Sequence, residues 1–349
     1  MDLTRLKDRP VEWLRGGPED DVVVSSRVRL ARNIDGFPFV GKASPRQTAR
    51  VEELLRDVLP SLPFEPGLEY VSLHDRPGLQ RELLVERRLI SREHAEADHV
   101  RGVAFDATEQ FAVMVNEEDH LRLQSMRGGL RLQEVFDGAE HLDDVIGSRV
   151  PFAFSSRYGY LTACPSNVGT GMRASVMLHL PGLVMAQEMD SVIALARDRQ
   201  LTLRGVYGEG SYGAGDFYQV SNHVTLGETE ESIVESVAEA TRDLAVMERR
   251  ARRNLHDKHL EEFRNRIDRA LRLLRSARTI SSQESLNLLS QVRMGVEMDM
   301  VESAGASVLN DLLLLTLPAH LQTMAGRELD SSVRNAVRAD FVKHRLSTG

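Results

Sequence analysis

Residues 113–126 constrain the fold most, because an apolar run ends there in a cluster of charged side chains. The segment has the sequence VMVNEEDHLRLQSM, and residues 111–115 predict a buried strand leading into it. Three consecutive carboxylates follow at 117–119, where neighbouring like charges raise each other's pKa and resist burial. A solvent-exposed loop would explain them, but two-residue spacing in an extended chain favours a site. One face of the extended segment would present three polar side chains: Glu118, His120 and Arg122.

The overall composition limits the class of protein. A chain of 349 residues is long enough for two domains, or for one large domain with an extension. A net charge of −8 argues against general nucleic-acid binding, and the single cysteine, Cys164, excludes a disulfide framework within the chain. The N-terminus has no apolar signal segment, and no apolar run approaches the ~18 residues that span a bilayer. We therefore expect a soluble protein in the cytoplasm.

Hydrophobic periodicity predicts an α+β first part and an all-helical second part. Alternation predicts strands at 22–30, 103–115 (a hairpin), 152–154, 158–161, 173–178, 201–204 and 216–222. Helical spacing predicts helices at 44–59, 79–99, 129–144, 190–199, 228–255, from 260 onwards, and at 284–294 after a capping box at Ser281 and Glu284. The tail is predicted to be helical with a break at Pro318. We expect two domains, 1–255 and 256–349.

A glycine-rich segment, GVYGEGSYGAGDFYQVSN, contains Gly208, Gly210 and Gly213 in a GxGxxG spacing. A dinucleotide site needs a helix after this motif, so that the pyrophosphate lies at the helix N-terminus. Here the following residues predict a strand, which excludes that interpretation. The glycines are better explained as hinges of a mobile loop that carries one acid, Glu209.

Five arginines lie on predicted strands or next to loops, and several forked guanidinium groups in one place suit a polyphosphate. The chain has neither a P-loop nor the HRD and DFG motifs of protein kinases, so arginines would hold a bound nucleotide. Phosphoryl transfer needs mainly positioning and charge neutralisation, which such a set supplies. The five are Arg27, Arg29, Arg122, Arg173 and Arg204.

The carboxylates indicate a cationic acceptor held between Glu118 and Glu209. A guanidinium is the natural planar partner of carboxylates. Its pKa lies far above neutral pH, so that deprotonation at pH 7 costs roughly 7–9 kcal/mol. The acceptor therefore needs a well-placed base, and its proton should leave as the N–P bond forms.

The segments SSRVRLARN, NEEDHLR, LTACPSNVGTGMRAS and RG-x-x-GE together resemble the guanidino phosphotransferase family, over roughly residues 20–255. The resemblance implies a large antiparallel sheet flanked by helices. It implies ATP as donor, with Mg²⁺ held mainly by phosphates and water and no protein metal site. By motif, Glu118 would bind the guanidinium and act as base beside Glu117, Glu209 would be the second clamp, and Cys164 would lie near the guanidinium. The five arginines would bind the phosphates. The motifs also place four residues in substrate or loop positions: Asn116, Asn167, Gly208 and Gly210.

The layout of the chain resembles one bacterial branch of that family, which phosphorylates arginine side chains within proteins. Only a short segment precedes SSRVR, where small-guanidine kinases carry a helical domain, and the helical part with ISSQESLNLLSQVRMG follows instead. An open site of this kind can admit a polypeptide. The resemblance implies a role in the stress response, with modified proteins marked for regulation or degradation. The implied partners are a second copy bound through the helical module, a zinc-binding activator protein, a transcriptional repressor as substrate and a AAA+ unfoldase–protease.

The tail of that branch carries an RDxxRA motif that binds phosphoarginine allosterically. This chain has RNAVRA instead, with Arg334, Asn335 and Arg338. Asn335 can accept hydrogen bonds but has no charge to pair with a guanidinium, so whether the allosteric site operates stays open.

Two other functions compete with protein arginine phosphorylation. One is a kinase for free arginine or another small guanidine, which an assay with both acceptors separates from the first. The other is a catalytically silent adaptor that acts through the helical module. The full set of site residues argues against an adaptor, since losing one preorganised charge contact can cost roughly 3–4 kcal/mol of transition-state stabilisation.

Overall fold

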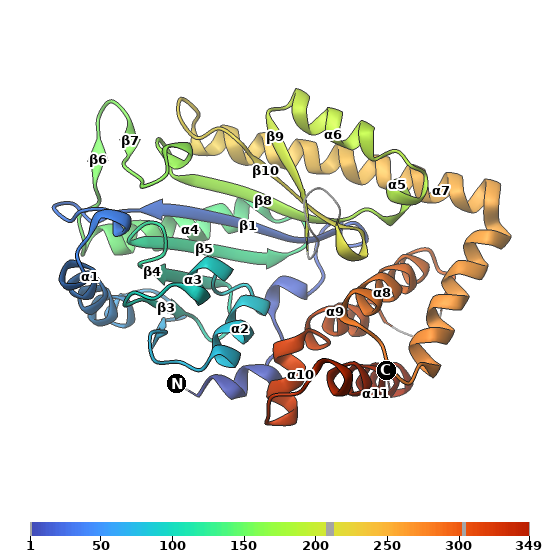
Figure 1. The fold of residues 1–349 in the computed structure, drawn as a ribbon. Helices are drawn as coiled ribbons and strands as arrows, with labels where there is room; N and C mark the ends of the chain where they lie inside the picture. Colours follow the sequence, from blue (N-terminus) through green and yellow to red (C-terminus); the bar gives the residue numbers. More distant parts are fainter. Residues whose placement is uncertain (1, 207–212, 302–304, 349) are drawn as a thin grey trace.

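An eight-stranded antiparallel sheet forms the centre of the molecule, and a helical module packs at one end of it (Figure 1). The computed structural model describes residues 2–206, 213–301 and 305–348. The strand order is β2-β3-β4-β5-β1-β8-β10-β9, and every neighbouring pair is antiparallel. The strands are β1 (Val23–Arg32), β2 (Glu69–Ser72), β3 (Gly102–Phe105), β4 (Phe111–Val115), β5 (Leu121–Gly128), β8 (Met172–His179), β9 (Leu201–Gly205) and β10 (Phe217–Asn222), and a separate hairpin is formed by β6 (Phe154–Ser155) and β7 (Gly159–Tyr160).

Helices cover both faces of the sheet. In the first part of the chain they are α1 (Pro45–Val58), α2 (Gly78–Glu86), α3 (Arg92–Glu96), α4 (Leu132–Gly147), α5 (Pro181–Met185), α6 (Met189–Asp198) and the long α7 (Glu230–Ser276). The module adds α8 (Ser282–Glu297), α9 (Ala306–Leu315), α10 (Pro318–Ala325) and α11 (Ser331–Thr348). Among the described residues, no helix combines the length and apolar character needed to cross a membrane.

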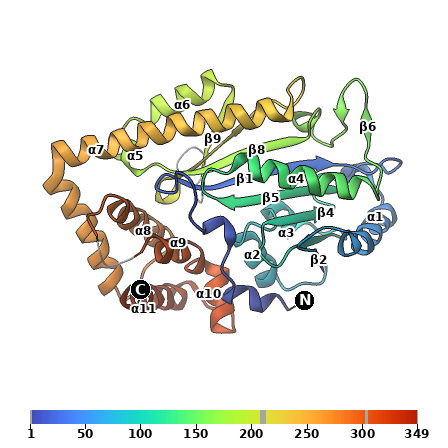
Figure 2. The same ribbon diagram turned by 180° about the vertical axis from the view of Figure 1, so that it is seen from behind.

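The two faces of the central strands differ in chemistry, because side chains alternate along each strand. Val28 and Leu30 of β1 are fully buried in the main core, which α4 and α7 cover on the rear face (Figure 2). Arg27 and Arg29 therefore point to the opposite face. This alternation, which the sequence predicted, places the cationic residues of different strands on one surface.

Most predicted elements are confirmed, and one helical prediction was wrong in its continuity. The predicted helix 79–99 is interrupted at Arg88, which has a positive φ of 61°, and α3 starts afresh with Ser91 as its N-cap. The predicted change from one helix (228–255) to a second (from 260) is confirmed in position, because α7 is kinked at His259, whose backbone is not helical (φ −137°, ψ 35°). The expected domain boundary at 255/256 falls inside α7, so the division into two domains stays a prediction.

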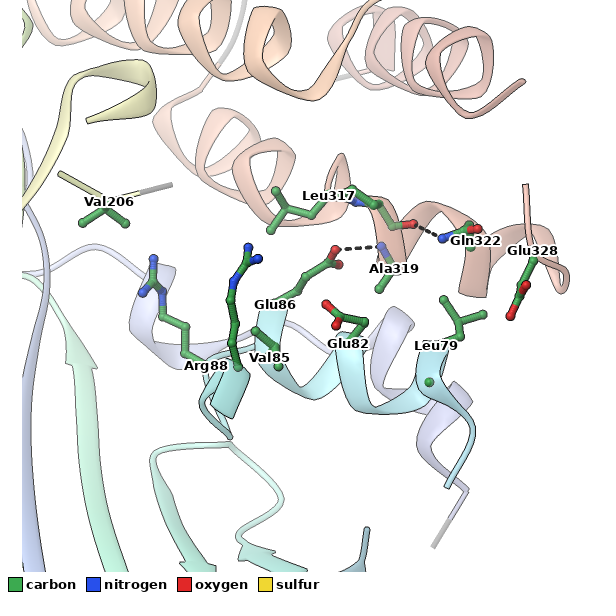
Figure 3. Close-up of a pocket in the computed structure, with 13 residues that line it drawn as sticks. Leu79, Glu82, Val85, Glu86, Arg88, Val206, Leu317, Ala319, Gln322 and Glu328 are labelled. Carbon is green, nitrogen blue, oxygen red and sulfur yellow. Dashed lines mark hydrogen bonds between the residues drawn. The ribbon is translucent and has the colours of Figure 1, made fainter. Parts of the chain in front are cut away.

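The helical module docks against the sheet and α2. Trp13, Val24, Met126 and Met177 share one buried apolar cluster with residues of α8, α9 and α11. Glu86 at the end of α2 accepts hydrogen bonds from the first free backbone N–H groups of α10, at Ala319 (2.7 Å) and His320 (2.9 Å). A cavity of about 710 Å³ lies beside this contact, lined by α2 and by the segment around α10 (Figure 3). The module is thus held both by apolar burial and by a helix cap.

Candidate active site

The carboxylate cluster occupies a tight turn between β4 and β5. Asn116 adopts the left-handed region (φ 58°), and its N–H donates to the carbonyl of His120 at 2.9 Å. The N–H of Glu117 donates to the carbonyl of Asp119 at 3.1 Å. The turn leaves Glu118 exposed at its tip. The interpretation of 118–122 as an extended segment was therefore wrong.

His120 and Asp119 support the turn from behind. The His120 ring is buried, and Nδ1 accepts the Ile34 N–H (3.0 Å), so that Nε2 carries the proton and donates to the Pro38 carbonyl (3.0 Å). Burial lowers the pKa of His120, which keeps it neutral. Asp119 accepts from the Asn33 amide and from the Ala163 N–H, both at 2.6 Å. His120 therefore does not line the site that the sequence predicted it would share with Glu118 and Arg122.

The arginines line one cavity of about 590 Å³ on the polar face of the sheet. Arg29 stands directly opposite Arg173 in the β1–β8 pairing, and Arg204 opposite Gln219 in the β9–β10 pairing. The structure thus brings all five predicted arginines together with both predicted acids of the turn. The cavity is lined by Arg27, Arg29, Ser91, Glu93, His94, Ala97, Glu117, Glu118, Arg122, Arg173, Arg204 and Gln219.

Burial and mutual repulsion lower the pKa values of three of these arginines. Burial lowers the pKa of Arg27 to about 9, helped by the charges of Arg88, Arg122 and Arg173. Burial and neighbouring arginines likewise hold the pKa values of Arg29 and Arg173 below their ordinary range. The Nε atoms of these last two are buried and have no hydrogen-bond partner among the described residues. The face is therefore preorganised for an anionic ligand that would supply both charge and acceptors.

The two neighbouring glutamates have opposite electrostatic environments. Burial raises the pKa of Glu117, but the charge of Arg122 and hydrogen bonds from Ser91 (2.6 Å) and Arg122 (2.6 and 2.7 Å) outweigh it, so the pKa ends below its ordinary value. Partial burial, with the charges of Asp119 and Glu117, raises the pKa of Glu118. Glu117 thus stays ionised as the partner of Arg122, whereas Glu118 is suited to accept a proton.

Several predicted residues lie beside the cavity rather than in its lining. Asn116 is buried, and its side chain donates to the carbonyls of Thr48 (2.9 Å) and Val100 (3.1 Å), which holds the turn. Cys164 is half-buried, with Sγ 3.0 Å from the Ser166 hydroxyl, and the Asn167 N–H donates to the Cys164 carbonyl (3.0 Å). Their loop is tied to the carboxylate turn through Ala163 and Asp119. The three remaining predicted residues lie outside the described residues: Gly208, Glu209 and Gly210.

Sequence reasoning missed the contribution of α3 and β10. Ser91, Glu93 and His94 line the cavity, and Ser91 both caps α3 and donates to Glu117. The N-cap signal of a serine before REHAE was present in the sequence, but the segment was interpreted as one continuous helix. On β10, two side chains facing the arginines accept hydrogen bonds from them: Gln219 from Arg27 (2.9 Å) and Ser221 from Arg173 (3.0 Å).

The predicted allosteric residues serve the packing of the module. Arg338 is fully buried and donates to the carbonyls of Thr316 (2.8 Å) and Ile280 (2.9 Å) and to Asn335 Oδ1 (2.8 Å). Burial lowers its pKa to about 10, and the charge of Arg334 contributes. Asn335 thus acts as an acceptor for Arg338, the one role that its sequence allowed. Binding of phosphoarginine at this place stays a prediction.

The described residues contain no group of three or more histidine, cysteine, aspartate or glutamate side chains placed to hold a metal ion. The arginine-lined cavity fits a polyphosphate in charge and in unpaired donors. An antiparallel sheet that presents converging arginines beside a carboxylate of raised pKa is the arrangement expected of one class of protein, the phosphotransferases.

Comparison with known proteins identifies the family. Residues 50–251 match the model of the ATP:guanido phosphotransferase C-terminal catalytic domain, and residues 260–349 match the protein-arginine kinase McsB C-terminal domain. The protein-arginine kinase of Halothermothrix orenii is 42% identical over 96% of both chains, and that of Desulforamulus reducens is 39% identical over 100% of this chain and 99% of its own. The chain therefore belongs to the protein-arginine kinases within the ATP:guanido phosphotransferase family.

Solved structures agree with this assignment. The duplicated taurocyamine kinase of Schistosoma mansoni, with bound components of a transition-state analogue, is 31% identical with a TM-score of 0.61. That match covers 71% of this chain and 35% of the duplicated enzyme, so this chain spans about a third of its length. Lombricine kinase is 28% identical with a TM-score of 0.58, over 68% of this chain and 69% of its own. The predicted family, fold class and enzyme class are confirmed.

Proposed function

We propose that this chain transfers the γ-phosphoryl group of ATP to arginine side chains of proteins. The observation that carries the proposal is the contrast between Glu117 and Glu118 at the edge of the arginine-lined cavity. One acid is fixed as an ion-pair partner, and the other has a raised pKa and an exposed position. A guanidinium at Glu118 would meet a phosphate held by the five arginines.

The chemistry follows from these positions. The arginines hold the phosphate oxygens and neutralise charge that shifts toward the leaving ADP, while Mg²⁺, held by phosphates and water, supplies further neutralisation. A guanidine nitrogen attacks the γ-phosphorus, so one N–P bond forms and the bond to the β–γ bridging oxygen breaks. The proton lost from nitrogen passes to Glu118. Arg122, aligned by Glu117, is placed to hold the transferring group near this carboxylate.

The remaining predicted site residues complete the proposal. Glu209, from the connection between β9 and β10, would be the second carboxylate on the acceptor guanidinium. Cys164 would lie next to that guanidinium, with Asn167 stabilising the same loop. The family comparison supports these assignments by motif, since the segments that carry them fall within residues 50–251.

The proposed acceptor, localisation, assembly and partners also rest on the family comparison. The relatives are named for arginine in proteins, which favours a polypeptide acceptor over free arginine. We place the protein in the cytoplasm as a homodimer formed through the helical module and active in the stress response. A zinc-binding activator, a repressor substrate and a AAA+ unfoldase–protease that receives marked proteins are its proposed partners.

The proposal is tested with the Glu118→Gln variant, and Glu53→Gln on exposed α1 serves as the control. Each protein receives labelled Mg-ATP with free arginine or with an unfolded arginine-containing protein, and acid-labile phosphate is measured. We expect label on protein arginines, a loss of about 10²–10⁴-fold in Glu118→Gln, and unchanged ATP affinity. Normal turnover by the variant would exclude Glu118 as base. Label on free arginine alone would favour the small-guanidine alternative.

A further inference from the structure

The hairpin β6–β7 presents an unusual apolar surface. It projects from the sheet at the end remote from the helical module (Figures 1 and 2). Phe154 is 61% exposed and Tyr158 is 45% exposed, and they are the only aromatic members of the exposed large apolar set among the described residues. Leu226, 53% exposed, lies close by, because its backbone packs against Gly169, which bridges to Tyr160. Exposed apolar groups that gather in one place indicate an interaction surface.

The hairpin is anchored rather than loosely attached. The Tyr160 ring packs edge-on against Phe154 (centroids 5.3 Å apart) and Phe152 (6.2 Å). The Arg32 guanidinium lies 3.4 Å from the Tyr160 ring centroid and is itself fixed by Asp143 in the core at 2.8 Å. An exposed aromatic surface on such a base loses little conformational freedom when it binds a partner.

The hairpin is also coupled to the carboxylate turn through Asn33. The Ala153 N–H donates to the Asn33 carbonyl (2.7 Å), and the Asn33 amide donates to the Leu161 carbonyl (3.0 Å) and to Asp119 (2.6 Å). Asp119 is the neighbour of Glu118. The base of the hairpin is therefore joined to the residue next to Glu118 through a single side chain, Asn33.

The orientation expected for the nucleotide leaves the hairpin side of the site free for the acceptor polypeptide. In the proposed function the γ-phosphate meets the acceptor at Glu118, which leaves Arg29 and Arg27, further along β1, to the rest of the nucleotide. Those two residues lead along β1 toward Ser25, the end of the sheet where the helical module packs. The hairpin stands at the opposite end, where the chain on either side of an acceptor arginine has to lie.

We propose that the β6–β7 hairpin is a docking surface for the polypeptide that carries the acceptor arginine. Phe154 and Tyr158 bind an apolar or aromatic side chain a few residues from that arginine. Apolar side chains of folded proteins are mostly buried, so the segment recognised is part of an unfolded chain. This inference rests on the proposed function and adds to it a class of substrate: arginines with apolar neighbours in unfolded polypeptides.

The test compares two short unfolded peptides, each with one arginine. One peptide has leucine roughly four residues away on either side, a span of about 13 Å, and the other has serine there. The double variant Phe154→Ser with Tyr158→Ser should lose about tenfold in kcat/KM on the leucine peptide. It should change little on the serine peptide and in its KM for ATP. The rescue variant Phe154→Leu with Tyr158→Phe should restore most of the rate, and Ile193→Ser with Val246→Ser, exposed on α6 and α7, is the matched control.

Binding separates this inference from the proposed function. The same peptides with lysine in place of arginine are measured by fluorescence anisotropy, and the leucine peptide should bind the double variant about tenfold more weakly than the unmodified chain. Equal losses on both peptides, or no loss on the leucine peptide, would overturn the docking surface. A chain that phosphorylates neither arginine peptide but still shows the binding difference would overturn the proposed function and leave the surface in place.

Discussion

At the scale of single residues, Arg29 is expected to lower the stability of the ligand-free fold and to raise the affinity for ATP. It faces Arg173 across the strands, and burial and like charges lower its pKa. We predict that Arg29→Met stabilises the protein without nucleotide by about 1 kcal/mol, because an apolar side chain replaces a buried charge. The affinity for ATP should fall at least tenfold, about 1.4 kcal/mol. Urea unfolding and calorimetric titration measure the two effects.

The control for this experiment is Arg157→Met on the exposed tip of the β6–β7 hairpin, which should change neither quantity. If Arg29→Met destabilised the ligand-free protein, the view that the arginine face is electrostatically strained would be wrong.

A second residue-scale prediction concerns acid. Burial lowers the pKa of His94 to about 4, and its Nε2 donates to the Gly102 carbonyl at 2.9 Å. The folded state then stays neutral while the unfolded chain, with a histidine pKa of about 6.5, takes up a proton. Stability due to this residue is therefore complete above pH 6.5 and falls between pH 6.5 and 4, by about 2 kcal/mol at pH 5. His94→Gln should flatten this part of the pH–stability curve, whereas exposed His74→Gln should not.

Residue-level chemistry could be predicted only in part from the sequence. The alternation of Arg27 and Arg29 correctly placed both on one face, because strand geometry fixes it. The separate environments of Glu117 and Glu118 could not be predicted, since Ser91 and Arg122 approach the turn from other elements. His120 was misplaced because a tight turn, rather than an extended strand, follows β4.

At the scale of elements, the contact between α2 and α10 joins the catalytic part to the module. Glu86 accepts the N–H groups of Ala319 and His320 and also contacts the His320 ring at 2.7 Å. We predict that Glu86→Ala lowers the free energy of unfolding by about 1–2 kcal/mol, as loss of a helix cap does. Glu82→Ala, in the lining of the same cavity (Figure 3), should cost much less.

Hydrogen exchange over 318–325 checks where this loss occurs. Faster exchange in α10 of Glu86→Ala, with β1 and β5 unchanged, would locate the cap at the module. Uniform acceleration through the sheet would contradict a local role.

The ends of helices could be predicted from the sequence where a short local pattern marks them. Ser281 is the N-cap of α8, as its capping pattern predicted, and α1 begins directly after Ser44, as the apolar spacing predicted. The break at Arg88 was missed because its neighbours have helical spacing, and tertiary contacts decide it: the Arg88 carbonyl accepts from Gln124 of β5 at 2.8 Å. The change of helix predicted between 255 and 260 coincides with the kink of α7 at His259, and the two halves of α7 pack in different apolar clusters.

At the scale of the whole molecule, the proposed docking surface and the helical module lie at opposite ends of the sheet. The hairpin and the carboxylate turn lie at one end, and the module packs at the other (Figure 1). Motifs in the sequence identified the chemistry between them, but the exposed surface of Phe154 and Tyr158 depends on how distant segments pack around Asn33. No local sequence pattern predicts that these two side chains are exposed.

The last prediction concerns the dependence of the catalytic part on the module. Trp13, Val24, Met126 and Met177 are buried in a cluster completed by α8, α9 and α11. A chain of residues 1–255 would expose this cluster, and Glu109 with Arg87 would lose the neighbouring His320, 3.4 Å from Arg87. We expect it to bind a hydrophobic dye and to lose the near-ultraviolet dichroism of its single tryptophan, since each buried apolar side chain contributes about 1.5–3 kcal/mol. A truncated chain that kept this signal, unfolded cooperatively and phosphorylated protein would show that the catalytic part folds alone.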